Sequence, residues 1–287
     1  MDFDVGLLLL LLTPVYFITI AAELYWLRKH PGKYTSAHYS WRDFFSNASL
    51  GIFYQASEKL TGVFVLAIYY SLFDFRLFDI PATAWSLALL FLLQDFLYYW
   101  FHRASHNIRW MWASHVAHHS SQRLNFSTAF RQSLTYPISG MWLFWVPLVM
   151  LGFPPETVVM VVLLNLFYQF FIHSQLVPKL GWFEWAFNTP RHHRVHHAHN
   201  ADYIDKNFGG ILIIWDRLFG TFVEEKETEA CRYGIPRQVN TYNPVTLTFH
   251  EWRDMFRDAF APGKTLGQRF RHLFGYPDWQ PDTPGKQ

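Results

Sequence analysis

The sequence predicts an all-α integral membrane protein. We expect four to five transmembrane or membrane-embedded helices in antiparallel hairpins, with a cytosolic helical cap that holds a histidine-rich di-metal site. Hydrophobic residues make up 51% of the chain and aromatic residues 20%, which is typical of membrane proteins with Trp and Tyr at the lipid–water interface. Several apolar runs approach or reach the length of a membrane span. Eight of the 15 histidines form three short clusters: His102 and His106; His115, His118 and His119; and His193, His196 and His197.

Composition also excludes several classes of protein. The mean hydropathy of +0.02 is low for a chain made wholly of spanning helices, so a sizeable polar part must lie outside the bilayer. A net charge of +2 is too small to indicate nucleic-acid binding. The single cysteine, Cys231, excludes an internal disulfide framework and a metal cluster held by thiolates.

The first apolar run covers residues 5–27 and is long enough to span a bilayer. It lacks the basic segment and the small-residue cleavage site of a signal peptide. Basic residues follow it, namely Arg28, Lys29, Lys33 and Arg42. The positive-inside rule therefore makes this end cytosolic and places the N-terminus outside.

The next two runs, residues 52–73 and 82–100, predict a helical hairpin because residues 74–81 form only a short link. Gln55, Glu58 and Lys59 weaken the first of these runs. Two interpretations of Glu58 and Lys59 stay open: they form a pair at the wall of a lipid cavity, or they mark a helix that starts later than residue 52.

A second hairpin is predicted from residues 136–151 and 156–172, with its turn at the Gly-Phe-Pro-Pro sequence of residues 152–155. This hairpin leaves the cytosolic face and returns to it. All three histidine clusters therefore meet at one cytosolic membrane face in a multi-pass protein.

Residues 173–287 contain no spanning run. The Asn-Thr-Pro sequence of residues 188–190 is a good helix start, and the helix that it opens carries His193, His196 and His197. Residues 249–274 alternate aromatic and basic side chains, which favours one amphipathic helix at the membrane interface over an ordinary surface helix. We expect poor order in residues 276–287.

The histidine spacing indicates a metal centre. Separations of three and four residues put side chains on one face of a helix. Neutral imidazole is a ligand for iron, zinc, copper and nickel. Eight imidazoles are too many for one ion and about right for two.

Asp95 is an ionisable residue inside an apolar run, which makes it a candidate functional residue. We expect it to orient a ligating histidine from another helix by accepting the second N–H of that imidazole. The alternative is a buried hydrogen bond to Tyr98, Tyr99 or a neighbouring helix.

Two further histidines are candidates. His173 ends the last apolar run, at the level of the clusters, and we expect it to be a metal ligand. His192 points about 100° away from His193 on the same helix, so we expect it beside the ligands rather than among them. The remaining histidines lack partners at helical spacing and are interpreted as surface residues: His30, His38, His199, His250 and His272.

Aromatic residues are numerous at the level of the clusters. We expect them to wall an apolar tunnel that brings a lipid to the metals, the alternative being a belt that faces the bilayer. The candidates are Tyr98, Tyr99, Trp100, Phe101, Trp110, Trp112, Phe126, Phe167, Tyr168 and Phe171.

The motifs resemble the fatty acid hydroxylase/sterol desaturase superfamily, and within it the bacterial sterol desaturase family proteins that are similar to alkylglycerol monooxygenase. The resemblance covers about residues 85–222 and rests on residues 95–103, 112–121, 128–133, 188–197, 203–210 and 215–221. It implies one membrane-bound domain over residues 1–287, with a catalytic core at 85–222 and an amphipathic part at 245–275. Asp95 and His192 are then the candidate catalytic residues beside the ligands.

The resemblance also implies the chemistry. It indicates two Fe ions in a non-haem centre that uses O2 to hydroxylate an unactivated C–H of a lipid, with desaturation as the alternative outcome. The sequence carries no GxGxxG fingerprint after a strand, so the electrons must come from outside the chain. The resemblance implies a redox protein or a tetrahydropterin as their source. A metal transporter is the rival class, but it would need ligands at the bilayer midplane. A zinc hydrolase would need the glutamate of an HExxH motif, which is absent from the sequence.

Overall fold

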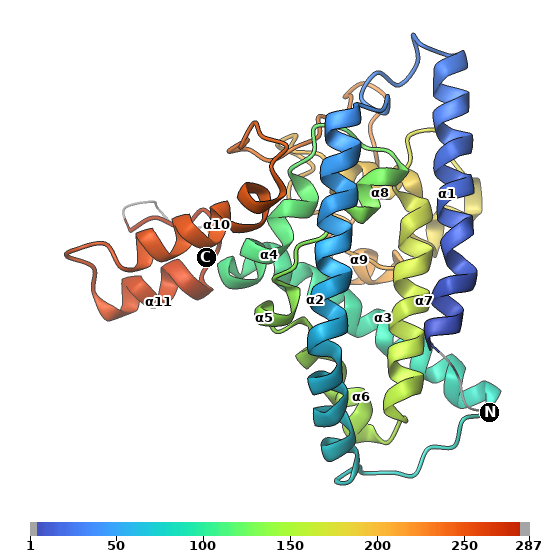
Figure 1. Ribbon diagram of the computed structural model, residues 1–287, viewed down its shortest axis with the longest axis vertical. Coiled ribbons are helices and arrows are strands. Elements are labelled where there is room, and N and C mark those ends of the chain that lie inside the picture. The colour runs from blue at the N-terminus through green and yellow to red at the C-terminus, as the bar shows by residue number, and fades with distance from the viewer. Residues whose placement is uncertain (1–4, 282–287) are drawn as a thin grey trace.

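The computed structural model describes residues 5–281, with side chains from residue 11 onward, and this part of the chain is helical (Figure 1). No strand occurs among the described residues, which contain only the isolated bridges Phe187–Leu212 and Ala198–Tyr233. The predicted all-α class is therefore confirmed.

Four long helices form the frame: α1 (Val5–Lys29), α2 (Trp41–Phe73), α3 (Ala84–Asn107) and α7 (Pro155–Ile172). In Figure 1, α1, α2 and α7 run roughly parallel to the long axis and α3 crosses behind them. Within the described residues, α3 and α7 are long and apolar enough to cross a membrane. The expected number of four to five spans exceeds these two.

Helix α2 begins at Trp41, 11 residues before the start predicted at residue 52. Glu58 and Lys59 consequently lie inside the helix, and the interpretation that they mark a later helix start is wrong. Lys59 is exposed, whereas Glu58 is half-buried and one of its carboxyl oxygens is buried without a hydrogen-bond partner.

The helix predicted over residues 136–151 is broken into three pieces: α5 (Tyr136–Ser139), the 3-10 helix η2 (Met141–Trp145) and α6 (Val146–Leu151). Gly140, with φ +85°, ends α5 in a left-handed conformation, and Pro147 starts α6 because its ring cannot continue a preceding helix.

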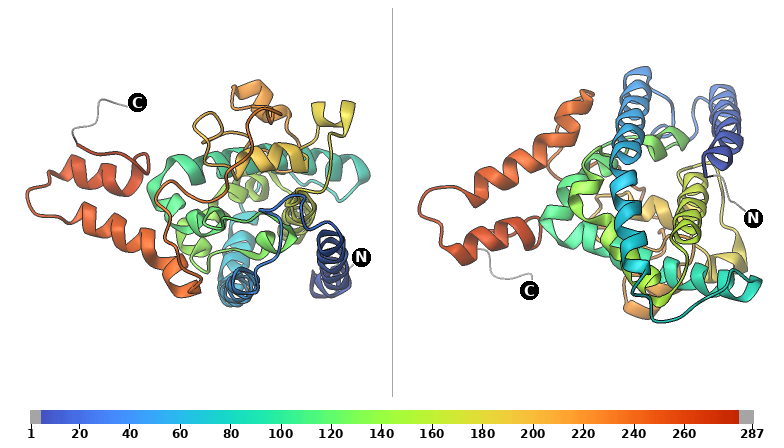
Figure 2. Two further views of the ribbon diagram at one scale, coloured as in Figure 1. Left: turned by 90° about the horizontal axis from the view of Figure 1, so that it is seen from above. Right: turned by 60° about the horizontal axis from the view of Figure 1, so that its bottom comes forward.

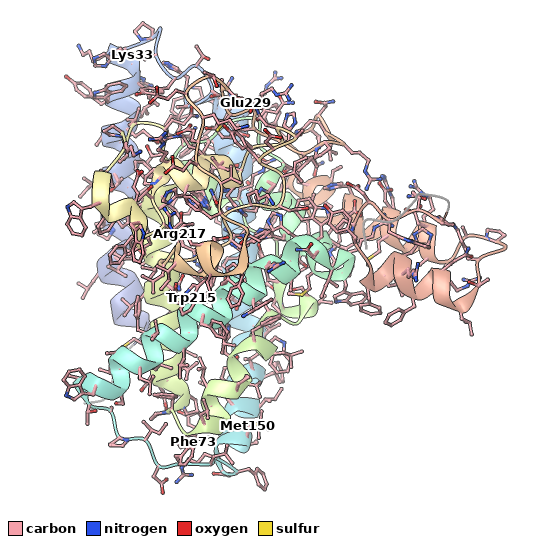
Figure 3. The ribbon with its side chains drawn as sticks, turned by 180° about the vertical axis from the view of Figure 1, so that it is seen from behind. Lys33, Phe73, Met150, Trp215, Arg217 and Glu229 are labelled. Carbon is pink, nitrogen blue, oxygen red and sulfur yellow. The ribbon has the colours of Figure 1, made fainter. Side chains whose placement is uncertain are left out.

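The turn between α6 and α7 follows the predicted Gly-Phe-Pro-Pro sequence. Gly152 has φ +117°, and a Cβ atom there would lie 1.9 Å from the carbonyl oxygen of Phe78, so only glycine fits. Leu77 also donates its N–H to the carbonyl of Met150 over 2.8 Å. The two hairpin turns thus meet at one end of the molecule. Figure 3 shows Phe73 and Met150 at this end and Lys33 and Glu229 at the other.

The amphipathic helix predicted over residues 249–274 is two helices, α10 (Pro244–Ala259) and α11 (Leu266–Phe274). Pro262 and Gly263, the latter with φ +78°, lie in the turn between them and explain the break. Both views of Figure 2 show this pair projecting from the rest of the chain.

Short elements connect the frame: α4 (Arg109–His119), η1 (Phe126–Phe130), η3 (Gly181–Trp185), α8 (Pro190–His196) and α9 (Ile214–Phe219). An apolar core that includes Tyr98, Phe101 and Trp145 fills the space between α3, η2 and α7. It underlies α4, whose Met111 belongs to the same core.

A buried ion pair attaches α10 to α4. The guanidinium of Arg109 is 1% exposed and donates to Glu251 over 2.7 Å and to Asp258 over 2.9 Å. Trp110 adds an edge-to-face contact with Trp252 at 4.9 Å between ring centroids. The C-terminal hairpin is thereby fixed against the helix that carries the second histidine cluster.

We expect Arg109→Ala to lower the free energy of unfolding by about 3–5 kcal/mol, because it removes the buried cation that Glu251 contacts at 2.7 Å and leaves this carboxylate only the more distant, exposed Arg237 at 3.7 Å. The measurement is chemical unfolding in detergent. Arg253→Ala is the matched control: its side chain is 70% exposed beside Asp254, so the change should stay within about 1 kcal/mol. Equal effects of the two substitutions would contradict the role given to Arg109.

Candidate metal centre

Nine histidines gather into two groups whose ring nitrogens lie within 4.8 Å of one another in each group. They are the nine residues that the sequence indicated as ligands. We call the first group cluster A and the second cluster B. Cluster A contains His102, His106, His115, His119 and His196, and cluster B contains His118, His173, His193 and His197.

Helix geometry explains how the sequence clusters divide. Residues four apart lie on the same helix face, so each such pair enters one cluster: 102 with 106, 115 with 119, and 193 with 197. His118 and His196 lie on other faces of α4 and α8 and enter the opposite cluster. His173, at the C-terminal cap of α7, completes cluster B. The two clusters are therefore interleaved, with α4 and α8 contributing to both.

The nine rings are buried, so a ring nitrogen without a hydrogen-bond partner is energetically costly. Each of the nine is between 1% and 6% exposed. Buried polar atoms in folded proteins have partners, and an unpaired one is costly. The outward nitrogens of several rings have such partners, whereas the inward Nε2 atoms of His106 and His196 have none.

The tautomers of cluster B follow from its outward bonds. Nδ1 of His118 lies 3.1 Å from the carbonyl of Arg131, and Nδ1 of His173 lies 2.7 Å from that of Gln169. A carbonyl only accepts, so Nδ1 carries the proton and Nε2 of a neutral ring carries a lone pair. The two Nε2 atoms nevertheless lie 3.2 Å apart. Two facing lone pairs repel, and a cation between them removes the conflict.

Cluster A shows the same pattern. Nδ1 of His102 donates to the carbonyl of Phe208 over 2.9 Å, so its Nε2 presents a lone pair to Nε2 of His115 at 3.1 Å. His115 is held on its other side by the hydroxyl of Tyr136 at 2.6 Å. Tyr136 belongs to this arrangement although its sequence position gave no sign of it.

The rings outside the long helices are neutral. Burial first, and the neighbouring imidazoles second, lower the pKa of His115 and His119 well below the usual range. The same causes lower the pKa of His193 and His197, and burial alone lowers that of His173 to about 4. Neutral imidazoles packed in this way are donors for transition-metal ions. The residues therefore fit a pair of metal ions.

One short segment contacts three histidines of cluster A. Besides Phe208, the carbonyl of Lys206 accepts from Nδ1 of His196 over 3.0 Å, and Asp205 faces Nδ1 of His106 at 3.3 Å. Sequence reasoning missed these partners because a backbone carbonyl leaves no signature in the side chains. The motif over residues 203–210 was the available signal.

Asp95 holds this segment rather than a histidine. Its carboxylate accepts from the backbone N–H of Ile211 over 2.8 Å and of Leu212 over 3.1 Å, from the Trp215 indole over 2.9 Å and from Asn165 over 2.9 Å. The expected direct contact with a ligating imidazole is therefore wrong. The alternative of a buried bond to a neighbouring element describes what is observed.

Asp216 provides a second anchor. It accepts from the N–H of Phe208 over 2.8 Å and of Gly209 over 2.7 Å, and from the Thr221 hydroxyl over 2.7 Å. Burial raises the pKa of this carboxyl to about 6 although these hydrogen bonds oppose the shift. Gly210 follows, where a Cβ atom would approach Asn165 to 2.7 Å. The carboxylates of Asp95 and Asp216 thus both bind backbone N–H groups of the segment that follows Asp205.

His192 lies outside both clusters. This agrees with the expectation that it is not among the ligands. Its ring is buried and stands edge-on to Phe222 at 5.3 Å. His250 and His272 are also buried, at 8% and 1% exposure, and the interpretation of these two as surface residues is wrong. Each fills a position in the C-terminal hairpin, where His272 packs on Trp279.

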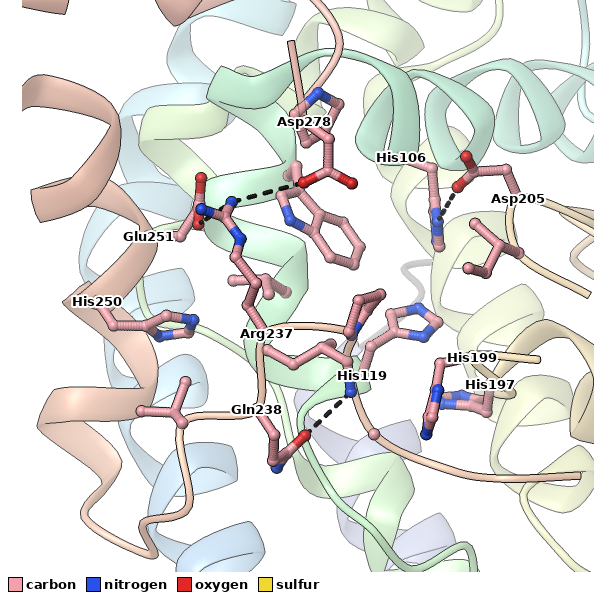
Figure 4. A pocket seen from close by; sticks show the side chains of 18 of the residues that line it. His106, His119, His197, His199, Asp205, Arg237, Gln238, His250, Glu251 and Asp278 are labelled. Atoms are coloured by element: carbon pink, nitrogen blue, oxygen red, sulfur yellow. Dashed lines mark hydrogen bonds and ion pairs between the residues drawn. The ribbon is translucent and has the colours of Figure 1, made fainter. Parts of the chain in front are cut away.

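A cavity of about 290 Å³ opens onto the clusters (Figure 4). His106, His119 and His197 lie at its inner end, while residues 234–239 and α10 form the outer wall. The wall is polar as well as apolar and includes Arg237 and Glu251. This cavity therefore differs from the expected tunnel, which was to be apolar and walled by aromatic residues.

Of the ten aromatic residues predicted for the tunnel, Trp112 alone lines this cavity. The others include residues packed in the core, such as Phe101 beside Phe144 and Trp145, and Phe126 stacked on Phe170. These rings pack between helices and do not line the cavity.

Comparison with known proteins supplies a family context. Residues 87–221 match the family model described as Fatty acid hydroxylase, which covers both clusters and the supporting segment. The chain is similar to the alkylglycerol monooxygenase of Homo sapiens, with 43% identity over 213 residues, 74% of this chain and 46% of that protein. That of Danio rerio is 37% identical over 276 residues, 95% of this chain and 60% of that protein.

A bacterial relative is more distant. The ornithine lipid hydroxylase of Rhizobium tropici is 29% identical over 156 residues, 54% of this chain and 47% of that protein. The chain thus spans about half the length of the curated relatives that it matches. No solved structure matches the chain.

We expect the purified protein to bind two transition-metal ions per chain, because there are two clusters of neutral imidazoles. His115→Ala and His118→Ala each remove one donor, from cluster A and cluster B respectively, and should lower the metal content. Elemental analysis measures it. His30→Ala is the control, since that ring stacks on Trp26 away from both clusters. One tightly held ion in the unsubstituted protein would reject a dinuclear centre.

Chelator-treated protein should lose stability as the pH falls. The pKa of His173 is about 4 in the folded chain, against 6.5 for an unperturbed histidine. Between these values the unfolded chain binds a proton that the folded chain does not, so the free energy of unfolding decreases as the pH falls through this window. Thermal unfolding at a series of pH values tests this. A melting temperature that is constant or rises towards pH 4 would contradict it.

Proposed function

We propose, from the match of residues 87–221 to the Fatty acid hydroxylase family model, that the chain is a member of this family and a membrane-bound di-iron monooxygenase that hydroxylates an unactivated C–H of a lipid. One observation carries the proposal: two adjacent clusters of buried imidazoles lie inside the matched region. The relatives named as a monooxygenase and as a lipid hydroxylase support the reaction type.

The choice of iron comes from the family, because neutral imidazole also binds zinc, copper and nickel. Cluster A would hold one ion and cluster B the other. When bound, the iron pair supplies the redox chemistry by which O2 is reduced and one of its oxygen atoms enters the substrate. The remaining atom leaves as water, so each turnover takes two electrons and two protons from outside.

The residues of the chain prepare this chemistry. The carbonyls of Lys206, Phe208 and Arg131 keep the proton of each bonded imidazole on Nδ1, which leaves Nε2 available. Asp95 and Asp216 keep two of these carbonyls in place through the backbone N–H groups that they accept. Close packing of the rings limits water to the cavity side.

The position of the clusters suits a lipid substrate. His102 and His106 lie in the C-terminal part of α3, and His173 caps the C-terminus of α7. Among the residues that the structure describes, these are the two helices long and apolar enough to cross a bilayer, and the clusters lie at one end of both. We propose that this end is cytosolic, since Arg28 and Lys29 close α1.

The electron donor is proposed to be external, either a redox protein or a tetrahydropterin. The polar cavity supports this route, because it leads from the surface to His106 and His119 without crossing the apolar core. Lipid and reductant would then approach the centre from different sides.

We expect membranes that contain the protein to accumulate a lipid with one added oxygen atom. Alkylglycerol and ornithine lipid are the probes, because relatives act on lipids of these names. Cells are grown under isotopically labelled O2, and mass spectrometry of the extracted lipids measures the label. His115→Ala and His118→Ala should abolish the product and His30→Ala should retain it.

The same measurement separates the alternatives. Loss of two hydrogens without added oxygen indicates a desaturase that uses the same centre. Lipids that stay unchanged while the membranes accumulate metal favour a transporter and contradict the proposed function.

A further inference from the structure

Tyr276 follows α11 and reaches back to the metal centre. Its hydroxyl donates to one carboxylate oxygen of Asp205, and the other oxygen faces Nδ1 of His106 at 3.3 Å. Figure 4 shows His106 and Asp205 pointing toward each other at the cavity. A phenol, a carboxylate and a ligand of cluster A therefore stand in one line, although 170 positions separate Tyr276 from His106.

The backbone on both sides fixes this line. Asp205 has φ +57°, a left-handed conformation that aspartate tolerates better than most residues. The next residue, Lys206, then presents its carbonyl to His196. At the other end, Gly275 accepts the N–H of Arg109 over 2.9 Å at the start of α4. Tyr276 is thus placed by the helix that carries two ligands of cluster A.

Asp205 gives His106 a partner of a different kind. The outward nitrogens of His102, His118 and His196 face backbone carbonyls, whereas that of His106 faces a carboxylate. A carboxylate partner makes the imidazole a stronger donor and fixes its orientation. The Asp205 side chain is 25% exposed at the cavity, so it needs a second contact to stay directed at the ring.

The phenol is suited to that task. Burial first, and the charge of Asp205 second, raise the pKa of Tyr276 above its ordinary value, so the hydroxyl keeps its proton and donates it to the carboxylate. Tyr276 also lines the cavity, which places this contact at the entrance to cluster A.

We propose that Tyr276 is a positioning residue of the metal centre: through Asp205 it orients His106 and strengthens metal binding at cluster A. The C-terminal part of the chain is then a component of the site and not only a surface attachment. The inference rests on the proposed metal pair and is independent of the lipid and of the reaction.

The test uses the full-length protein in detergent, stripped with chelator and titrated with Co²⁺, whose visible absorption reports its ligands. We expect Tyr276→Phe, which removes only the hydroxyl, to weaken one of the two Co²⁺ equivalents by about 10–100-fold and leave the other unchanged. Tyr242→Phe is the matched control: this tyrosine lies in the same C-terminal part and is 46% exposed. It should bind both equivalents like the unsubstituted protein.

A second variant separates positioning from general stability. Asp205→Asn should weaken the same equivalent, and the double variant should bind no more weakly than Asp205→Asn alone, because both changes interrupt one path. Unchanged binding by Tyr276→Phe, or equal weakening of both equivalents, overturns the inference. Binding of fewer than two equivalents by the unsubstituted protein instead rejects the dinuclear centre on which it rests.

Discussion

The structure depends on one electrostatic constraint: nine imidazoles are buried close together in two clusters, and several of them direct an Nε2 lone pair toward a neighbouring ring. Such an arrangement is repulsive without a cation, as the facing Nε2 atoms of His118 and His173 at 3.2 Å show. Protonation of the rings would add positive charge in a buried place, and burial lowers the pKa of His118 and of His173 accordingly. The proposed binding of metal ions would relieve this repulsion. The fold must therefore supply an acceptor behind the outward nitrogens and exclude groups that would compete at the inward ones.

The segment from Asp205 to Leu212 meets much of the first requirement. It offers two carbonyls and a carboxylate to cluster A, and it has no regular secondary structure with which to hold its own shape. Asp95 from α3 and Asp216 from α9 bind its backbone N–H groups instead. Two carboxylates distant in sequence thus determine where ring protons reside, without touching a ring. This also explains how Asp95 can serve the centre from about 10 Å along the helix axis from His102.

The centre stands between two environments. On one side lie the apolar helices α3 and α7 and the aromatic core that includes Tyr98 and Trp145. On the other side a polar cavity, walled by residues 234–239 and the C-terminal hairpin, reaches the rings. The proposed reaction, which would join a lipid with O2, electrons and protons, would need access from both sides. The ion pairs of Arg109 hold the hairpin that forms the polar side.

The sequence by itself indicated the eight clustered histidines as candidate ligands, because separations of three and four residues within a helix fix which side chains share a face. It also indicated His173, the all-α class and the long apolar helices. Glycine and proline at Gly140 and at Pro262 and Gly263 indicated helix ends, but the apolar pattern around them favoured continuous helices, and the structure has helix breaks there.

Only the tertiary structure decided how the nine histidines divide between two clusters, since that depends on how α4 and α8 face each other. It likewise decided that Asp95 holds a loop, that His192 turns away, and that Asp205, Tyr136 and Tyr276 join the site. These contacts join residues far apart in the chain, and every residue type has a backbone carbonyl. The spacing of residue types along the sequence therefore cannot predict them.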